Sequence, residues 1–314
     1  MHMADALISP VVGGAGWAAT LALAGYSARK IKVAADDTSV PMMGVGAAFV
    51  FAAQMLNFTI PGTGSSGHLG GGLILAAMLG PCAAFLAMAS ILTVQALFFA
   101  DGGLLALGCN VVNLGFFPCF LAYPLLFRPI AGASPTRARL TAASMVAAIV
   151  GLQLGAFGVV LETKLSGITA LPMNTFLLMM QPIHLAIGVV EGLATAAVIL
   201  FVWQARPGIL HAGSVRPDAD SGAVPKKLVA AFLVAALAMS GALSWFASTK
   251  PDGLEWSVAK ASGVAQMAAP VAAETTWPAV DAGTSLAGVV GAALTLIVAG
   301  LIGLAVRRRF AAKA

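Results

Sequence analysis

Nine stretches of this chain are long and apolar enough to cross a lipid bilayer as helices. A spanning helix needs about 20 mostly apolar residues, because each residue adds about 1.5 Å along the helix axis. By that measure the segments are 7–27, 41–58, 69–80, 82–99, 104–127, 138–162, 176–205, 228–247 and 285–306. The third segment is short, contains three consecutive glycines and ends at Gly80-Pro81, so we expect it to be tilted or broken.

The composition excludes a water-soluble protein. Only 9% of the residues are charged and 60% are hydrophobic, whereas about 25% of the residues in a soluble domain are charged. So few charges cannot cover a soluble surface, which excludes a soluble enzyme, a disordered chain and a nucleic-acid-binding protein. We therefore predict an all-α, polytopic membrane protein that lies in a lipid bilayer.

The positions of the basic residues indicate how the spans are oriented. Of the 17 Lys and Arg residues, only Lys164, Lys250 and Lys260 fall on one side of the nine-span arrangement. Lys and Arg are enriched in the cytoplasmic loops of membrane proteins. We therefore expect the N-terminus outside and the C-terminus in the cytoplasm, and we attribute the net charge of +5 to topology.

A polar segment divides the chain into two membrane domains. Residues 206–227 contain Pro, Gly and charged residues, and they fall on the cytoplasmic side. We predict a membrane domain of seven spans over 1–205, a cytoplasmic linker over 206–227 and a two-helix hairpin domain over 228–314. The outer loop of the hairpin contains the sequence PDGLEWS at 251–257.

Two of the four histidines are placed where they can bind a metal ion. The terminal amine of Met1, the amide nitrogen of His2 and Nδ1 of its ring can close a five-membered and a six-membered chelate ring around a divalent ion. His68 ends the loop TIPGTGSSGHLGGG on the same outer side and is the candidate for a fourth nitrogen. Four nitrogens in a square suit Ni(II) or Cu(II).

This hypothesis requires Met1 to be the first residue of the mature protein. The first ten residues contain no Lys or Arg, so they lack the basic region of a signal peptide. Met1 is expected to be retained, because an initiator methionine is normally removed only before a small residue. The residues alone leave two alternatives open, namely a solvated terminus at His2 and a hydrogen-bonding role for His68.

The same loop also permits an enzymatic interpretation. Residues 64–67 match the GxSG pattern of rhomboid-type intramembrane proteases, with Ser66 as nucleophile and His184 as a possible base. His184 and Glu191 lie on one face of a predicted span, where charged residues usually face an interior or a cavity, and we expect a supporting or packing role for both. Asparagines in or near spans that could line a polar site are Asn57, Asn110 and Asn113.

Two sequence patterns are absent. The sequence has no GxxxxGK[ST] segment, so we expect no ATP site of the P-loop type. The predicted spans also lack the rows of carboxylates that are expected in a cation-coupled transporter. If the chain moves an ion, another protein has to supply the energy.

Several segments together resemble the CbiM/NikM family. They are MHMADALISP at the N-terminus, the loop PGTGSSGHLGGG, the tripeptide LGP, QALFFADGGLLALGCNVVN at 95–113, and PIHLAIGVVEG. The members of this family are substrate-capture (S) components of energy-coupling factor (ECF) transporters for cobalt or nickel. The resemblance covers about residues 1–205, and the tail with PDGLEWS resembles the small companion subunit CbiN/NikN.

The resemblance implies a seven-helix S component whose N-terminus inserts into its own core, with the metal ligands at Met1 (terminal amine), His2 (amide nitrogen and ring) and His68 (ring). It implies Ni²⁺ or Co²⁺ as the transported substrate, a prokaryotic inner-membrane location and no enzymatic activity of the chain itself. It also implies partners, namely a transmembrane coupling (T) subunit and two cytoplasmic ABC ATPase subunits. The S component is expected to topple in the membrane when it releases its ion.

One departure from the family concerns the tail. The capture and companion parts are often separate chains, whereas here they are fused through 206–227. The fusion leaves the ligand positions unchanged, but the metal preference of unfused relatives does not transfer directly. Square-planar nitrogen donors favour nickel, although Co(II) can occupy the same donors, so we expect nickel. The tail contains no predicted ligand, and its role stays open.

Overall fold

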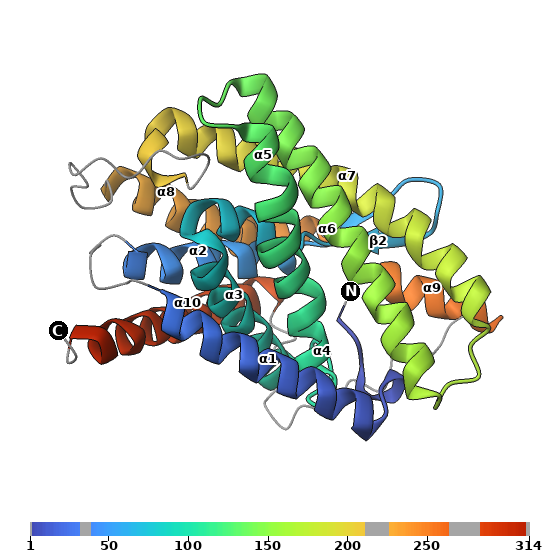
Figure 1. Cartoon of the computed structure of the whole chain (residues 1–314). Helices are drawn as coiled ribbons and strands as arrows, with labels where there is room; N and C mark the ends of the chain where they lie inside the picture. Colours follow the sequence, from blue (N-terminus) through green and yellow to red (C-terminus); the bar gives the residue numbers. More distant parts are fainter. Residues whose placement is uncertain (1, 32–38, 211–225, 264–282, 312–314) are drawn as a thin grey trace.

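The computed structural model describes residues 2–31, 39–210, 226–263 and 283–311, which form a bundle of helices (Figure 1). The first elements are η1 (Asp5–Leu7), α1 (Pro10–Lys30), α2 (Ser39–Gln54), β1 (Phe58–Ile60), β2 (Ser65–Gly67), α3 (Gly72–Phe99), α4 (Leu107–Val111) and η3 (Val112–Phe127). They are followed by α5 (Arg128–Ala131), α6 (Arg137–Ser166), α7 (Met173–Ala205), η4 (Pro207–Ile209), α8 (Lys226–Leu237), η5 (Ala238–Ala242), η6 (Leu243–Phe246), α9 (Gly253–Ser262) and α10 (Gly283–Ala311).

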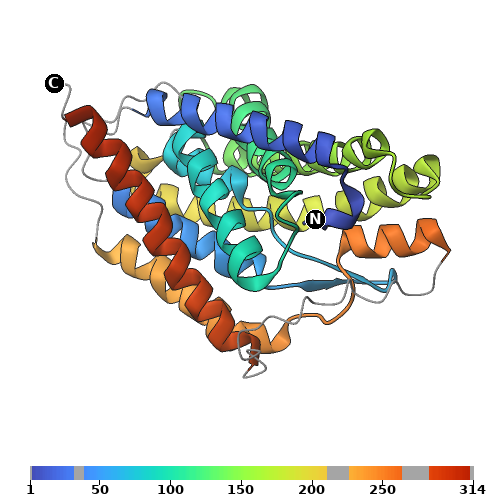
Figure 2. The same ribbon diagram turned by 90° about the horizontal axis from the view of Figure 1, so that it is seen from below.

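The strands β1 and β2 form a short antiparallel hairpin, with Phe58 opposite Gly67 and Ile60 opposite Ser65. This hairpin corrects the second predicted span, because the helix that was expected over 41–58 already ends at Gln54. The hairpin runs along the edge of the bundle towards α9 (Figure 2). It matters for the site because His68 follows β2 directly.

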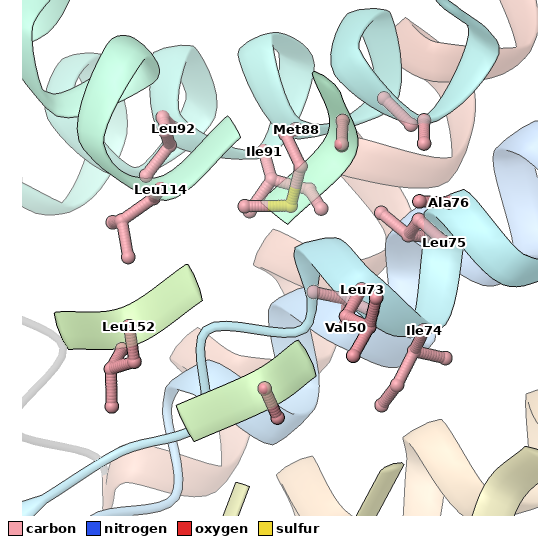
Figure 3. Packing of buried hydrophobic residues seen from close by; sticks show 14 of the residues in the cluster. Val50, Leu73, Ile74, Leu75, Ala76, Met88, Ile91, Leu92, Leu114 and Leu152 are labelled. Carbon is pink, nitrogen blue, oxygen red and sulfur yellow. The ribbon is translucent and has the colours of Figure 1, made fainter. Parts of the chain in front are cut away.

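The helices pack around α3, which lies at the centre of the bundle. Of an 18-residue stretch of α3, 78% is buried, compared with 28% for the helix over Lys226–Phe246. Figure 3 shows the packing of side chains that come from α2, α3, η3 and α6. The labelled members of this core are Val50, Leu73, Ile74, Leu75, Ala76, Met88, Ile91, Leu92, Leu114 and Leu152.

The chain folds back on itself inside α3, at the break that the sequence predicts. Gly80 has φ 75° and ψ 165°, and Pro81 follows it. The side chain of Gln54 donates to the carbonyl of Gly70 at 2.7 Å and accepts from Gln95 at 2.8 Å. A straight helix would separate residues 70 and 95 by about 37 Å, so the two arms of α3 lie alongside each other.

The protein is a multi-pass membrane protein. Six helices among the described residues are long and apolar enough to cross a membrane, namely Gly72–Phe99, Leu107–Ala131, Arg137–Ser166, Met173–Ala205, Lys226–Phe246 and Leu286–Val306. Val40–Gln54 is a shorter apolar helix, and α1 is long enough but less apolar. Large apolar side chains such as Leu178, Leu193 and Phe201 are exposed on the outside of the bundle, where lipid can cover them.

The helices α8 and α10 near the C-terminal end pack directly on α2 and α3. Phe232 of α8 contacts Phe49 of α2 with ring centroids 5.0 Å apart. A Cβ atom at Gly291 of α10 would collide with Phe51 of α2 and Phe99 of α3. Close approach at this glycine therefore lets α10 lie against the bundle, as Figure 2 shows.

Replacing Gly80 with alanine tests the fold-back of α3. We expect Gly80→Ala to lower the free energy of unfolding by about 1–3 kcal/mol, because a φ near +75° with extended ψ is open only to glycine. Gly25→Ala is the control, since Gly25 is helical and has open space around its Cβ position. Thermal unfolding in detergent would measure both variants, and equal melting temperatures for Gly80→Ala and the wild type would contradict the argument.

Candidate metal centre

His2 and Met3, the first described residues, lie inside the bundle, and side chains hold this end of the chain in place. Asn110 of α4 accepts a hydrogen bond from the Met3 nitrogen at 2.8 Å and donates to the Met3 oxygen at 3.2 Å. The nitrogen of Gly103 also donates to the Met3 oxygen, at 2.9 Å. Asp5 accepts from the nitrogen of Ala106 at 2.9 Å. These bonds attach the residues after His2 to the loop and helix that follow α3.

A carboxylate holds the glycine-rich loop that follows His68. Glu191 of α7 accepts hydrogen bonds from the nitrogens of Gly70 at 2.6 Å and Gly71 at 2.8 Å. Gly71 has φ 73°, and a Cβ atom at this position would collide with Val50. The loop therefore needs glycine for its conformation and Glu191 for its buried N–H groups.

The two anchored segments bring His2 and His68 together. Their rings are stacked, with centroids 5.0 Å apart and an interplanar angle of 14°. The side chains are 6% and 8% exposed. Burial lowers the pKa of both rings to about 3, so both imidazoles are neutral at neutral pH and each presents a nitrogen lone pair.

The hydrogen bonds indicate which ring nitrogens are available. Nδ1 of His68 lies 3.1 Å from the carbonyl oxygen of Leu69, so this nitrogen donates and Nε2 keeps the lone pair. Nδ1 of His2 lies 3.2 Å from Oδ1 of Asp101. The predicted chelate uses that same Nδ1, so binding an ion there would replace the contact with Asp101.

Carboxylates next to the two histidines were not predicted from the sequence. Asp101 faces His2, and Oδ2 of Asp252 lies 3.9 Å from Nε2 of His68. Asp101 lies within QALFFADGGLLALGCNVVN at 95–113, and Asp252 lies within PDGLEWS at 251–257. The missing signal was the packing of the tail against the loop of His68, which no local pattern reveals.

The structure limits how many side chains can contribute to a metal site. In the part of the chain that the structure describes, no group of three or more His, Cys, Asp or Glu side chains could hold a metal ion. A chelate that includes main-chain nitrogen needs only the two rings of His2 and His68. The predicted third ligand residue, Met1, lies outside the described residues.

His184 lies beside this arrangement. It lines a cavity together with His68, Asp252 and Gly253. Nδ1 of His184 is 2.8 Å from the carbonyl oxygen of Met180, and its Nε2 is buried without a hydrogen-bond partner among the described residues. The helix α7 therefore contributes both Glu191, which holds the loop, and an imidazole next to His68.

The geometry does not favour the protease interpretation. The hydroxyl of Ser66 donates to the carbonyl of Lys250 at 2.7 Å, and no hydrogen bond joins it to His184 within the described ranges. A serine nucleophile needs a base within hydrogen-bond reach. Ser66 instead connects the loop to the tail.

Comparison with known proteins points to metal uptake. Residues 2–209 match the family model described as CbiM, cobalt uptake substrate-specific transmembrane region, and residues 226–277 match the PDGLE domain. A putative fused nickel transport protein from Archaeoglobus fulgidus is 33% identical over 94% of this chain and 96% of its own length. A cobalt transport protein from Geobacter sulfurreducens is 30% identical over 74% of this chain and 68% of its own length.

A solved structure supports the same likeness. The crystal structure of a truncated transition metal transporter superposes with a TM-score of 0.57 and is 29% identical. It covers 65% of this chain and 99% of its own length. The similarity to solved structures therefore covers about the length of the larger predicted domain.

The role of Glu191 in holding the loop can be tested by mutation. Glu191→Ala leaves the N–H groups of Gly70 and Gly71 without their acceptor, and we expect it to lower the free energy of unfolding by about 2 kcal/mol or more. Glu191→Gln keeps one acceptor oxygen, so its loss should be smaller. Thermal unfolding in detergent would rank the variants, and a wild-type melting temperature for Glu191→Ala would refute the anchoring role.

Proposed function

The chain belongs to the CbiM family of metal uptake proteins, and from this premise we propose that it is the metal-binding S component of an ECF-type transporter that imports Ni²⁺ or Co²⁺. Its relatives are named as nickel and cobalt transport proteins, which indicates a transporter and not an enzyme. One observation carries the proposal, namely the N-terminal segment that enters the bundle and stacks His2 on His68.

The ion is held by four nitrogens in this proposal. They are the terminal amine of Met1, the amide nitrogen and Nδ1 of His2, and Nε2 of His68. The neutral state of both rings supports this assignment, because a protonated imidazole cannot bind a metal. Before the ion binds, the carboxylate of Asp101 holds Nδ1 of His2. The ion then takes the place of Asp101 at this nitrogen.

Nickel is the proposed preference between the two metals. A square of nitrogen donors that includes a deprotonated amide stabilises Ni(II) more than Co(II), in keeping with their order of affinity for nitrogen sites. The fused relative from Archaeoglobus fulgidus is named as a putative nickel transport protein, and it shares this chain's two-part organisation over 96% of its length.

We also propose the nine-span topology, with the N-terminus outside and the C-terminus in the cytoplasm. The fold-back at Gly80 divides α3 into two arms, which supports counting residues 69–80 and 82–99 as two spans. The contact of His2 with His68 supports placing the N-terminus and the loop after β2 on one side. The domains in this proposal are 1–205, 206–227 and 228–314, and the linker lies mostly outside the described residues.

Partners supply the energy for transport in this proposal. The sequence has no P-loop of the GxxxxGK[ST] type, so a transmembrane coupling subunit and two cytoplasmic ABC ATPases would drive release of the ion. The membership in a family of transporter components supports partners in general.

Shifting His2 along the chain tests the chelate. Two leucines inserted between Met1 and His2 move the ring to the fourth position and leave the Met3–Asn110 contact in place. We expect about one Ni²⁺ per chain in the native protein and at least about tenfold less in the variant, because the amine and the ring no longer share one chelate. Two residues are used because a third-position histidine can form a different chelate with the two amides before it.

Metal analysis of the purified proteins gives the readout. The matched control carries the same two leucines after Ala314, and thermal unfolding checks that both variants are folded. Undiminished Ni²⁺ in the N-terminal insertion variant would show that the ion is bound by other ligands.

A further inference from the structure

The tail sits on the loop that contains His68. The nitrogen of Ser66 donates to the carbonyl of Pro251 at 2.8 Å, and its hydroxyl donates to Lys250 at 2.7 Å. Farther along, the Trp256 indole donates to the carbonyl of Thr63 at 2.9 Å. These bonds join the β-hairpin to residues 248–256, which we call the docking segment.

The docking segment fixes the position of Asp252. Asp252 caps the N-terminus of α9, because its Oδ1 accepts from the nitrogen of Glu255 at 2.8 Å, while the Glu255 carboxylate accepts from the nitrogen of Asp252 at 3.1 Å. Gly253 lies so close to α7 that a Cβ atom would come within 2.9 Å of Ile187 and 3.1 Å of His184. The cap and this close contact leave Oδ2 of Asp252 directed at His68.

The distance between Asp252 and His68 suits a bridging cation. Oδ2 of Asp252 and Nε2 of His68 are 3.9 Å apart. Bonds from a divalent transition metal to imidazole nitrogen or carboxylate oxygen are about 2.0–2.2 Å long, so the separation of the two atoms is close to the distance that one bridging ion would span.

A third polar atom borders the same space. Nε2 of His184 has no hydrogen-bond partner within the described residues, and His184 is only 1% exposed. It lines the cavity together with His68 and Asp252. This imidazole nitrogen gives the cavity one further polar position next to His68 and Asp252.

We propose that Asp252 of the PDGLE segment is a ligand for the incoming ion: its Oδ2 and Nε2 of His68 receive the hydrated divalent cation and then pass it to the nitrogens of the N-terminal chelate. This inference rests on the proposed function and assigns a role to the fused tail. Nitrogen donors hold Ni²⁺ more tightly than carboxylate oxygen does. The ion therefore moves from a weaker contact that includes oxygen to a stronger site made of nitrogens.

Asp252→Asn separates this role from helix capping. Asparagine is as good an N-cap as aspartate, so the variant keeps the cap of α9 and removes the negative charge and one oxygen. We expect the association rate of Ni²⁺ with the full-length protein to fall by about tenfold, as for other carboxylates that attract or receive a charged ligand. Because Asp252 is not a ligand in the final chelate, the equilibrium affinity and the final Ni²⁺ content should stay at the wild-type values, and the dissociation rate should fall by the same factor.

Glu255→Gln is the matched control. It removes the same charge from the other residue of the capping box, and its oxygen can still accept from the nitrogen of Asp252. Stopped-flow mixing with NiCl₂ and a coloured nickel chelator measures the association rates of wild type and both variants. Glu255→Gln should match the wild type, and thermal unfolding should show all three proteins folded.

The outcomes separate this inference from the proposed function. If the wild type binds Ni²⁺ and Asp252→Asn binds it at the same rate, Asp252 is not a capture ligand, although the chelate stands. An equal slowing by Glu255→Gln would also overturn the inference, because general surface charge would then explain the rate. A wild type that binds no Ni²⁺ would overturn both proposals.

Discussion

Non-helical backbone inside a membrane protein needs hydrogen-bond partners that water cannot supply. This constraint governs two segments here, the backbone at Met3 and the glycine-rich loop before α3. Asn110 pairs with the backbone of Met3, and Glu191 accepts from Gly70 and Gly71. Without these partners neither segment could stay inside the bundle, and His2 would not reach His68.

The fold-back of α3 connects the two segments. Gln54 bonds to Gly70 and Gln95 at once, so the start of α3 and its second arm are tied to the end of α2. The second arm leads to Asp101, which faces His2. A single glycine with positive φ, Gly80, thus determines that the loop before α3 and the loop after it both border the same two histidines.

Fusion in one chain keeps the tail close to the site on which it docks. A companion segment on a separate chain must find its site by diffusion, whereas one on the same chain is present at a high effective concentration. The docking segment uses main-chain carbonyls of Lys250 and Pro251 to pair with Ser66. The tail thereby contributes Asp252 and Gly253 to the lining of the cavity and places Asp252 next to His68.

Sequence patterns predicted the helical membrane class, the break at Gly80-Pro81 and the meeting of His2 with His68. These features follow from apolar run lengths, from Pro and Gly, and from two histidines on one side of the membrane. Metal ligation by His2 and His68 stays a prediction. The end of α2 at Gln54 and the position of Asp252 next to His68 were missed, because a strand pairing and a contact between segments far apart in the sequence depend on tertiary packing that local patterns do not contain.

The coordination of bound nickel shows directly whether the four nitrogens of Met1, His2 and His68 hold the ion. X-ray absorption spectroscopy on the full-length protein loaded with one equivalent of Ni²⁺ reports the geometry and the donor atoms of the ion. The proposed chelate predicts a four-coordinate, square-planar site with nitrogen donors only. A six-coordinate site with several oxygen donors would contradict it, because the terminal amine, the amide of His2 and the two imidazoles could not then be the ligands that hold the ion.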